Sequence, residues 1–207
     1  MKNVKLEVTN YFDKGKYSRI ALSGRNVVEV HEGTSVVTND LYFNVGELDG
    51  GYCSFQLDAG TKYDTGKKPS VCINNSNVVV EVHETSSDFD NKLYYNIGKL
   101  HAWNNSIEFE NDAVHYDAGF TPFIAMNDQG ILVEVHGGEW FSVGKLYIKV
   151  GVVSSAGDDL VFSDSSNYTS GYNPTVAINN GNWVVTVNEN SNDELYYQIG
   201  YWDGSKN

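Results

Sequence analysis

A glutamate and a histidine alternate with valines in a hexapeptide that occurs several times in the sequence. The copies are "VVEVHE" at residues 27–32, "VVEVHE" again at 79–84, "LVEVHG" at 132–137 and a diverged "VVTVNE" at 184–189. Carboxylate and imidazole groups can bind hydroxyls, hold cations or transfer protons. The repeated Glu-x-His pair is therefore the first candidate for chemistry in this chain.

The copies recur at a nearly constant spacing, which indicates an internal repeat of about 52 residues. The fifth position of the hexapeptide is occupied by His31, His83, His136 and Asn188. A series of glycines keeps the same spacing: Gly15, Gly66, Gly119 and Gly171. We divide the single domain 1–207 into repeats of approximately 11–62, 63–115, 116–167 and 168–207, with 1–10 completing the last repeat.

Each repeat predicts four short strands. An aromatic-x-x-Gly turn such as "YDTG" comes first, and a short apolar strand such as "PSVCI" follows it. The hexapeptide is the second strand, "LYYNIG" is typical of the third, and "SIEFEN" is typical of the fourth. These segments are β-branched and aromatic and are bounded by turn residues. Four strands in a period near 50 residues are typical of a propeller blade.

The predicted fold is therefore all-β, a four-bladed β-propeller with four antiparallel strands per blade. The last repeat stops before its fourth strand, and "VKLEVTN" at residues 4–10 matches that strand. The N-terminal strand is expected to close the last blade, which would remove an exposed sheet edge.

This topology is expected to bring polar side chains of each repeat to one rim, because the second strand returns to the point where the first began. The candidates are Phe12, Asp13, His31 and Glu32; Tyr63, Asp64, His83 and Glu84; and Tyr116, Asp117 and His136. The fourth repeat has Tyr168, Thr169, Asn188 and Glu189 instead, so its site is expected to be inactive.

A carboxylate also lies in the middle of the second strand, at Glu29, Glu81 and Glu134. Both faces of a propeller sheet meet neighbouring blades, so these groups must be hydrogen-bonded or paired. They could be structural, held by backbone N–H groups or by a third-strand tyrosine such as Tyr42 or Tyr94. They could equally contact a ligand between blades, and the same two roles are open for the histidines.

A rim of aromatic, carboxylate and imidazole groups suits a sugar, which presents an apolar ring face and hydroxyls. Calcium could bind the same oxygens and zinc could bind His with Glu, but no spacing is diagnostic and no cofactor is expected. Trp140 is a further candidate, since it lies in the loop after the third hexapeptide on the same rim. Trp183 begins the fourth hexapeptide strand and is expected in the core.

Composition argues against several classes. The net charge is −13, with 14 basic and 27 acidic residues, which disfavours nucleic acid and anionic membranes as partners. No segment has the pattern of a transmembrane span or a signal peptide, so a cytoplasmic location or release by another route is expected. Cys53 and Cys72 stand at non-equivalent repeat positions and are expected to be buried thiols rather than a disulfide.

The blade text "NPTVAINNGNWVVTVNE…ELYYQIG" resembles the repeats of bacterial and fungal propeller lectins. That resemblance covers all four repeats and implies sugar pockets between blades, lined by aromatic and polar side chains. The chain departs from those lectins in lacking their repeated Trp, with tyrosine at the third-strand position. Its blade count resembles that of hemopexin-like domains, without their repeat motif.

The sequence thus predicts a multivalent carbohydrate-binding propeller that is not an enzyme, with glycans as partners and an open oligomeric state. No Ser–His–Asp order, phosphate loop or zincin motif is present, although a hydrolase using Glu81 and Asp64 is a further alternative. The main alternative is a protein-binding or toxin-associated scaffold that recognises its partner through the Trp140 loop.

Overall fold

A computed structural model of the chain describes residues 11–35, 37–48, 60–110 and 112–204. Within these ranges the elements are strands and one 3-10 turn, η1. The first blades contain β1 Lys16–Ser23, β2 Asn26–Glu32, β3 Asp40–Glu47, β4 Thr61–Thr65, β5 Lys67–Ile73, β6 Val78–Glu84, β7 Lys92–His101, β8 Ser106–Phe109 and β9 Val114–Ala118. The later ones contain β10 Phe120–Met126, β11 Ile131–Gly137, η1 Trp140–Ser142, β12 Lys145–Val153, β13 Leu160–Phe162, β14 Ser166–Ser170, β15 Tyr172–Ile178, β16 Trp183–Glu189 and β17 Leu195–Tyr201. In the described part of the chain, no helix is long and apolar enough to cross a membrane.

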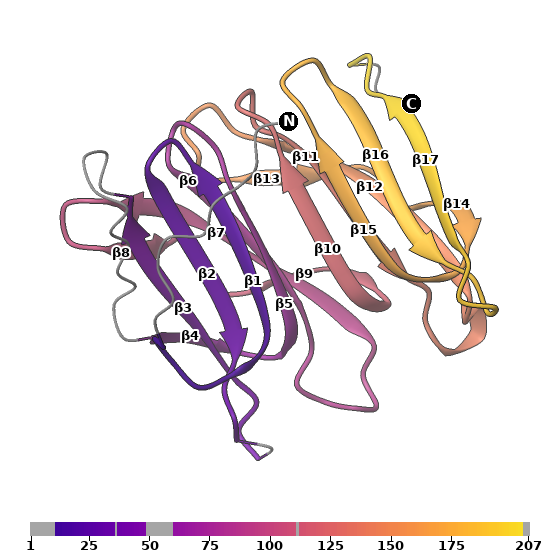
Figure 1. Ribbon diagram of the computed structural model, residues 1–207, viewed down its shortest axis with the longest axis horizontal. Helices are drawn as coiled ribbons and strands as arrows, with labels where there is room; N and C mark the ends of the chain where they lie inside the picture. The colour runs from indigo at the N-terminus through magenta and orange to yellow at the C-terminus, as the bar shows by residue number, and fades with distance from the viewer. Residues whose placement is uncertain (1–10, 36, 49–59, 111, 205–207) are drawn as a thin grey trace, which may run out of the picture.

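The strands form four antiparallel sheets that stand side by side (Figure 1). We name them blade 1 (β1–β4), blade 2 (β5–β9), blade 3 (β10–β14) and blade 4 (β15–β17). Strand order follows sequence order in each, and in blades 2 and 3 the outermost position is shared by two short strands, β8 with β9 and β13 with β14. The prediction of an all-β, four-bladed propeller is confirmed, with three to five strands in each sheet.

Three of the four aromatic-x-x-Gly segments lie in strands, not in the turns that the sequence predicted, whereas the first, residues 12–15, precedes β1 and is not a strand. Tyr63 and Asp64 lie in β4, which pairs with β3 of blade 1, and Tyr116 and Asp117 lie in β9, which pairs with β7 of blade 2. Each of these strands therefore belongs to the outer edge of one blade and leads directly into the first strand of the next. The backbone stays extended there because the third strand is longer than the fourth and offers free ladder positions.

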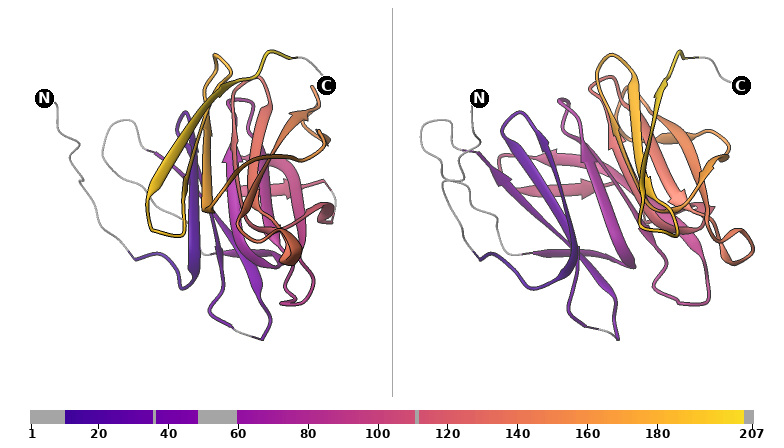
Figure 2. Two further views of the ribbon diagram at one scale, coloured as in Figure 1. Left: turned by 90° about the vertical axis from the view of Figure 1, so that its right-hand side faces the viewer. Right: turned by 45° about the vertical axis from the view of Figure 1, so that its right-hand side comes forward.

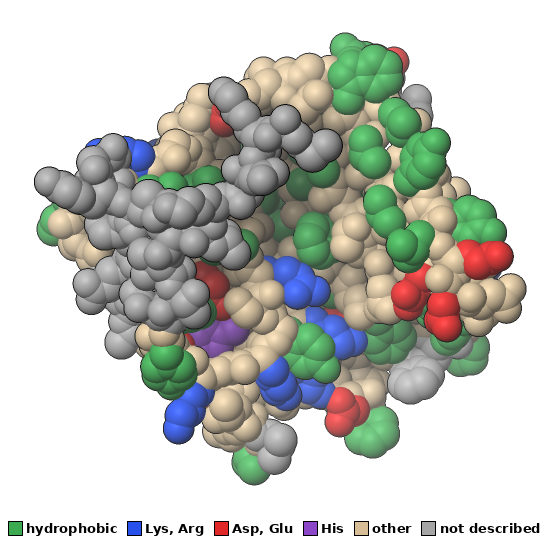
Figure 3. Space-filling model, in the orientation of Figure 1, with side chains coloured by type: hydrophobic (Ala, Val, Ile, Leu, Met, Phe, Trp, Pro, Cys, Tyr) green, Lys and Arg blue, Asp and Glu red, His purple; other side chains and the backbone are tan. Residues whose placement is uncertain are grey.

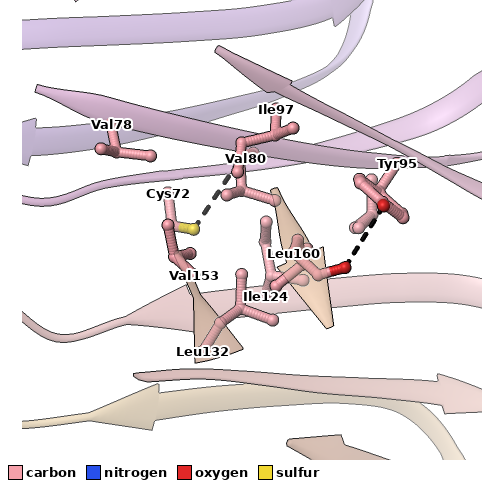
Figure 4. Packing of buried hydrophobic residues seen from close by; sticks show 10 residues of the cluster. Cys72, Val78, Val80, Tyr95, Ile97, Ile124, Leu132, Val153 and Leu160 are labelled. Atoms are coloured by element: carbon pink, nitrogen blue, oxygen red, sulfur yellow. Dashed lines mark hydrogen bonds between the residues drawn. The ribbon is translucent and has the colours of Figure 1, made fainter. Parts of the chain in front are cut away.

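The hexapeptide valines pack between neighbouring blades, as their alternation predicts. Val79 and Val80 are the first two residues of the blade 2 hexapeptide and point to opposite sides of the sheet. Val79 packs in one cluster with Val28 and Val30 of blade 1, whereas Val80 packs in another with Ile124 of blade 3. Figure 4 shows the blade 2–blade 3 core, in which the thiol of Cys72 donates to the carbonyl of Val80 at 3.7 Å. Cys72 is a buried free thiol, as expected, and burial raises its pKa well above the usual range. Cys53 lies outside the described residues.

Every blade has a β-bulge at the same place in its first strand. The register shifts there in all four first strands, and the bulged residues have φ between 48° and 55°: Tyr17, Lys68, Thr121 and Asn173. A left-handed backbone is unfavourable for residues with a side chain. Its fourfold recurrence therefore indicates a geometric need, and the contacts described below identify it.

Blades 1 and 4 stand at the two ends of the row (Figure 2). β1 packs on β5, β5 on β10 and β10 on β15, whereas the described strands of blades 1 and 4 have no comparable contact with each other. The predicted closing strand, residues 1–10, lies outside the described residues. Trp183 was expected in the core but is 54% exposed, because none of the described strands packs against its side of blade 4.

Candidate functional site

The predicted Glu, His and Asp side chains meet in three equivalent clusters. Cluster 1 is Glu29, His31 and Asp13; cluster 2 is Glu81, His83 and Asp64; cluster 3 is Glu134, His136 and Asp117. The histidine Nδ1 lies 3.0, 3.1 and 2.9 Å from a glutamate Oε2 in clusters 1, 2 and 3. The histidine Nε2 lies 3.8, 3.8 and 3.9 Å from an aspartate Oδ2. Each imidazole is thus bracketed by two carboxylates.

Cluster 2 shows how the fold builds this arrangement. The two-residue period of β6 puts Glu81 and His83 on the same side of the strand. Asp64 arrives from β4 of the preceding blade, so the cluster joins two blades. The ring of Tyr94 stacks on His83 with centroids 5.8 Å apart and planes 12° apart. Gly66 lies against the other edge, where a Cβ would collide with the imidazole.

The same packing recurs in the other two clusters. Tyr42 stacks on His31 at 5.6 Å and Tyr147 stacks on His136 at 5.5 Å. Gly15, Gly66 and Gly119 recur at equivalent positions because each lies against the imidazole of its cluster, where a side chain would have no room. The repeated tyrosines and glycines therefore fix the orientation of the imidazoles.

A residue of the third strand completes each cluster, and the sequence interpretation missed it. Asn44 Nδ2 donates to Glu29 Oε2 at 2.8 Å. Asn96 Nδ2 donates to Glu81 Oε2 and to Asp64 Oδ2, both at 3.1 Å. The signal was available, since both asparagines follow the stacked tyrosine by two positions.

Cluster 3 has a lysine in place of this asparagine. Lys149 Nζ donates to Asp117 Oδ2 at 2.9 Å, and the hydroxyl of Ser165 donates to the same oxygen. Burial opposes ionisation of Asp117, but these hydrogen bonds outweigh it and hold its pKa below the usual range. Cluster 3 therefore carries one more positive charge than clusters 1 and 2.

Two of the mid-strand glutamates, Glu134 and Glu29, accept from a further hydroxyl, but not from the third-strand tyrosines that the sequence suggested. Tyr116 of β9 donates to Glu134 Oε1 at 3.0 Å. In cluster 1 a phenylalanine, Phe12, stands at the Tyr116 position, and the hydroxyl of Ser18 donates to Glu29 Oε1 at 2.6 Å instead. The other repeats have proline at the Ser18 position, so the serine supplies the hydroxyl that Phe12 lacks.

The electrostatics favour a protonated imidazole in all three clusters. The hydrogen bond that His31 Nδ1 donates to Glu29 raises the pKa of His31. Burial alone would lower the pKa of His83 and His136, but the Glu81 and Glu134 carboxylates outweigh it and raise the pKa of both. A charged imidazole donates from both nitrogens, which suits its position between two carboxylates.

The acid at the end of the hexapeptide is buried and links blades. Glu32 Oε1 of blade 1 accepts from the backbone N–H of Lys68 in blade 2 at 2.7 Å. Glu84 Oε1 of blade 2 accepts from the backbone N–H of Thr121 in blade 3 at 2.5 Å. Both donors are bulged residues, so the bulge turns an N–H towards the carboxylate of the preceding blade.

The fourth repeat is neutral at the equivalent positions. Thr186, Asn188 and Gln198 replace the glutamate, the histidine and the third-strand residue, and Thr186 bonds to Gln198 at 2.6 Å. Tyr168 and Thr169 lie in β14, at the places of the aromatic residue and the aspartate. The glutamate, the histidine and the aspartate are all replaced by neutral residues in this repeat, which indicates that the three charges act as one electrostatic unit.

A pocket of about 340 Å³ opens beside cluster 1. It is lined by Phe12, Asp13, Lys14, His31, Gly33, Thr34, Ser35, Asp40, Tyr42 and Gly60. The aspartates are the accessible members of the clusters, with side chains 22–30% exposed, whereas the three glutamates are at most 3% exposed. A ligand would therefore meet the aspartate and the loop around it, with the imidazole behind.

Two aromatic side chains project from the loops after the hexapeptides of blades 2 and 3. Phe89 is 94% exposed and Phe141 is 100% exposed. Trp140, the predicted candidate in this loop, is the first residue of η1. Within the described ranges, no group of three or more His, Cys, Asp or Glu side chains could hold a metal ion.

The chain shares its fold with solved glycosidase structures. It matches Trypanosoma rangeli sialidase in complex with sialic acid at TM-score 0.56 and 11% identity, over 91% of this chain and 36% of that one. It matches a mutant NanB sialidase from Streptococcus pneumoniae at 0.54 and 9%, over 84% and 28%. It matches a mutant alpha-L-arabinofuranosidase Arb93a from Fusarium graminearum, in complex with an iminosugar inhibitor, at 0.54 and 14%, over 90% and 61%.

The chain spans less than two thirds of each of these structures. No protein-family model matches the chain, and no curated protein matches it. The similarities show the β-propeller fold. The matched structures are sialidases and an arabinofuranosidase, whereas the sequence resemblance was to propeller lectins.

Proposed function

We propose that the protein binds carbohydrates through several equivalent sites and is not an enzyme. The pocket at cluster 1 carries this proposal. It combines an aromatic ring, Phe12, with the carboxylates of Asp13 and Asp40 and the hydroxyls of Thr34 and Ser35. Rings that cover the apolar face of a pyranose, together with acceptors and donors for its hydroxyls, are what a sugar site requires.

Asp13 is the group expected to contact the ligand directly. Its carboxylate is 30% exposed and lies 3.8 Å from His31 Nε2, too far for a full hydrogen bond. One oxygen can therefore accept from a sugar hydroxyl. The buried Glu29 orients His31 from behind and is expected to act as a positioning residue.

A catalytic role for the paired carboxylates is the less favoured reading. Glu81 has no exposed surface, and its Oε2 is occupied by His83 and Asn96. A glycosidase needs both carboxyl groups at the scissile bond. The similarity to sialidase and arabinofuranosidase structures supports a carbohydrate ligand for this fold. The burial of Glu81 supports recognition without cleavage.

Near-identical clusters would make binding multivalent. Weak single sites gain about 10²–10⁴ in avidity when several engage one array of ligands. The expected result is binding to clustered glycans on an array and weak binding of the corresponding monosaccharide by calorimetry. Folded protein that binds no glycan at any density would refute the proposal.

A matched pair of variants locates the site. Asp13→Asn removes the exposed carboxylate of the pocket and should weaken binding by about 10-fold or more, the value of a hydrogen bond to a charged group. Asp90→Asn changes an exposed aspartate that pairs with Lys92 and should leave binding unchanged. Equal effects of the two variants would place the site elsewhere.

A second candidate is a protein-binding or toxin-associated scaffold, and the full exposure of Phe141 favours it. Aromatic side chains at loop tips are frequent anchors in protein interfaces. In that case Phe141→Ala abolishes capture of a protein partner, whereas Asp13→Asn does not affect it. The two candidates therefore give opposite results with the same two variants.

A further inference from the structure

We propose that a second copy of this chain packs head-to-tail against the first, with the exposed face of blade 4 in one copy covering the exposed face of blade 1 in the other. The proposal is independent of the carbohydrate ligand. It rests on a comparison of repeat-equivalent side chains inside and at the ends of the row of blades.

Each internal junction uses the same two surfaces. The forward face of a blade is formed by its second and third strands, and the rear face of the next blade is formed by its first and second strands. At the first junction the forward residues are Val28, Val30, Phe43 and Val45, and the rear residues are Val71, Ile73 and Val79. At the last junction Val133 and Val135 meet Val176 and Val184.

The forward face of blade 4 has the same apolar character, but no described strand of the chain covers it. Val185 and Val187 occupy the repeat positions of Val133 and Val135, and they are 38% exposed where their equivalents are 0% exposed. β17 adds exposed aromatic and aliphatic side chains to this face: Tyr197, Ile199 and Tyr201. Figure 3 shows hydrophobic side chains gathered on the surface over this end of the molecule. Exposed apolar surface of this extent is characteristic of an interface.

The rear face of blade 1 is its counterpart. Ile20 and Leu22 occupy the repeat positions of Val71 and Ile73. They are 64% and 59% exposed, whereas Val71 and Ile73 are 5% and 6% exposed. Val27, at the repeat position of Val79, is only 3% exposed, so the open part of this face lies on β1. The chain therefore presents apolar surface from both halves of its own internal junction, one at each end.

The hydrogen bond that links neighbouring blades also has both of its halves at the ends of the row. Glu32 and Glu84 accept from the bulged N–H of the next blade, at Lys68 and Thr121. Glu189 stands at this position in blade 4, and Tyr17 is the bulged residue of blade 1. A second copy placed by the internal geometry would bring the Glu189 carboxylate to the Tyr17 N–H.

The free edge of blade 4 is a third feature that matches the internal junction. Among the described residues, β17 has no outer strand beside it, whereas β3, β7 and β12 each do. Residues 11–15 precede β1 and carry Phe12 and Asp13 at the places of Tyr63 and Asp64 of β4. In the second copy this segment would lie along β17 as β4 lies along β3, which is strand addition at a free edge.

The contact is heterologous, because two different faces meet. Such contacts form closed rings when the rotation between subunits permits and open chains otherwise. The apolar surface, the carboxylate–amide link and the free edge all match the internal junction of this chain, which is why a copy of the chain is the partner that we infer.

Sedimentation velocity over a range of protein concentrations tests the proposal. The expected result is a species heavier than the 23.0 kDa monomer. Tyr197→Lys in the forward face and Ile20→Lys in the rear face should each give a monomer, because a lysine would be buried without a partner. Val161→Lys, at an equally exposed site in β13, should associate like the wild type. Circular dichroism and thermal melting confirm that each variant is folded.

An equimolar mixture of Tyr197→Lys and Ile20→Lys tests whether the two faces bind each other. Each variant retains one intact half, so the mixture should form a dimer that neither forms alone. A wild-type chain that is monomeric at every concentration would overturn the proposal, whether its own ends close on each other or stay free. Association that survives in both lysine variants, or a mixture that stays monomeric, would overturn it too.

Discussion

Replacing Glu81 by glutamine tests the view that each cluster is an electrostatic unit. Glu81 is fully buried and accepts from His83 Nδ1 and from Asn96 Nδ2, each at 3.1 Å. Glutamine has nearly the same shape and can still accept from Asn96, so the change removes the charge and little else. His83 then keeps only Asp64, 3.8 Å away, as a counter-charge.

The structure sets the expected size of the effect. Removing one partner of a buried ion pair costs about 3–5 kcal/mol, and the retained shape places Glu81→Gln near the lower value. A loss of about 3 kcal/mol corresponds to a drop in Tm of about 6–12 °C for a chain of this length. Urea unfolding followed by tryptophan fluorescence gives the free energy of unfolding directly.

The dependence on pH separates charge from packing. The pKa of His83 is raised in the folded protein, so its stabilisation is complete below the unfolded value of about 6.5 and is lost as pH rises through the folded value. The cost of Glu81→Gln should therefore be larger at about pH 6 than at about pH 9. A loss that is the same at both pH values, or smaller than about 1 kcal/mol, would refute the reasoning.

An exposed pair of the same chemistry is the control. Glu108 accepts from His101 Nε2 at 3.0 Å, but its side chain is 77% exposed. Glu108→Gln should change the free energy of unfolding by less than about 1 kcal/mol at either pH, because exposed ion pairs contribute little. The contrast between the two variants isolates the effect of burial.

Three further outcomes follow from the clusters. Gly66→Ala should lower stability by about 1–3 kcal/mol in thermal melts, because its Cβ would collide with the His83 ring; Gly200→Ala, where a Cβ meets nothing within 4 Å, is its control and should be near neutral. Ser18→Ala should cost about 1.5–3 kcal/mol in urea unfolding, because it removes the hydroxyl that donates to the Glu29 carboxylate; no change would mean that this bond is not formed in solution. The wild-type protein should lose stability as pH rises from about 6.5, because all three buried histidines have raised pKa values; a flat profile across that range would contradict the assignment.

The repeat made much of the fold predictable. A period of about 52 residues, four strand-like segments and alternating valines led to a four-bladed propeller with the valines between blades. The structure confirms the four blades, and it confirms the valine positions except at the blade 4 end of the row, where Val185 and Val187 are exposed. The meeting of Asp64 with His83 was also predictable, because antiparallel strands return to the rim from which they started.

The sequence interpretation was wrong about the local role of several residues. Asp64 was placed in a turn of its own repeat, yet it lies in the outer strand of the preceding blade. Tyr94 was offered as a donor to Glu81, yet it stacks on His83. Periodicity shows which side of a strand a residue occupies, but not which neighbouring strand faces it.

The sequence by itself determined the number of blades, the residues between them and the residue types of each cluster, because a duplicated unit copies its pattern of alternation. Only the tertiary structure decided that the glutamates and histidines are buried while the aspartates reach the surface. It also decided that Val185 and Ile20 are exposed where their repeat equivalents are buried. Burial depends on what lies against a side chain, and identical text in the middle and at the end of a row of blades meets different neighbours.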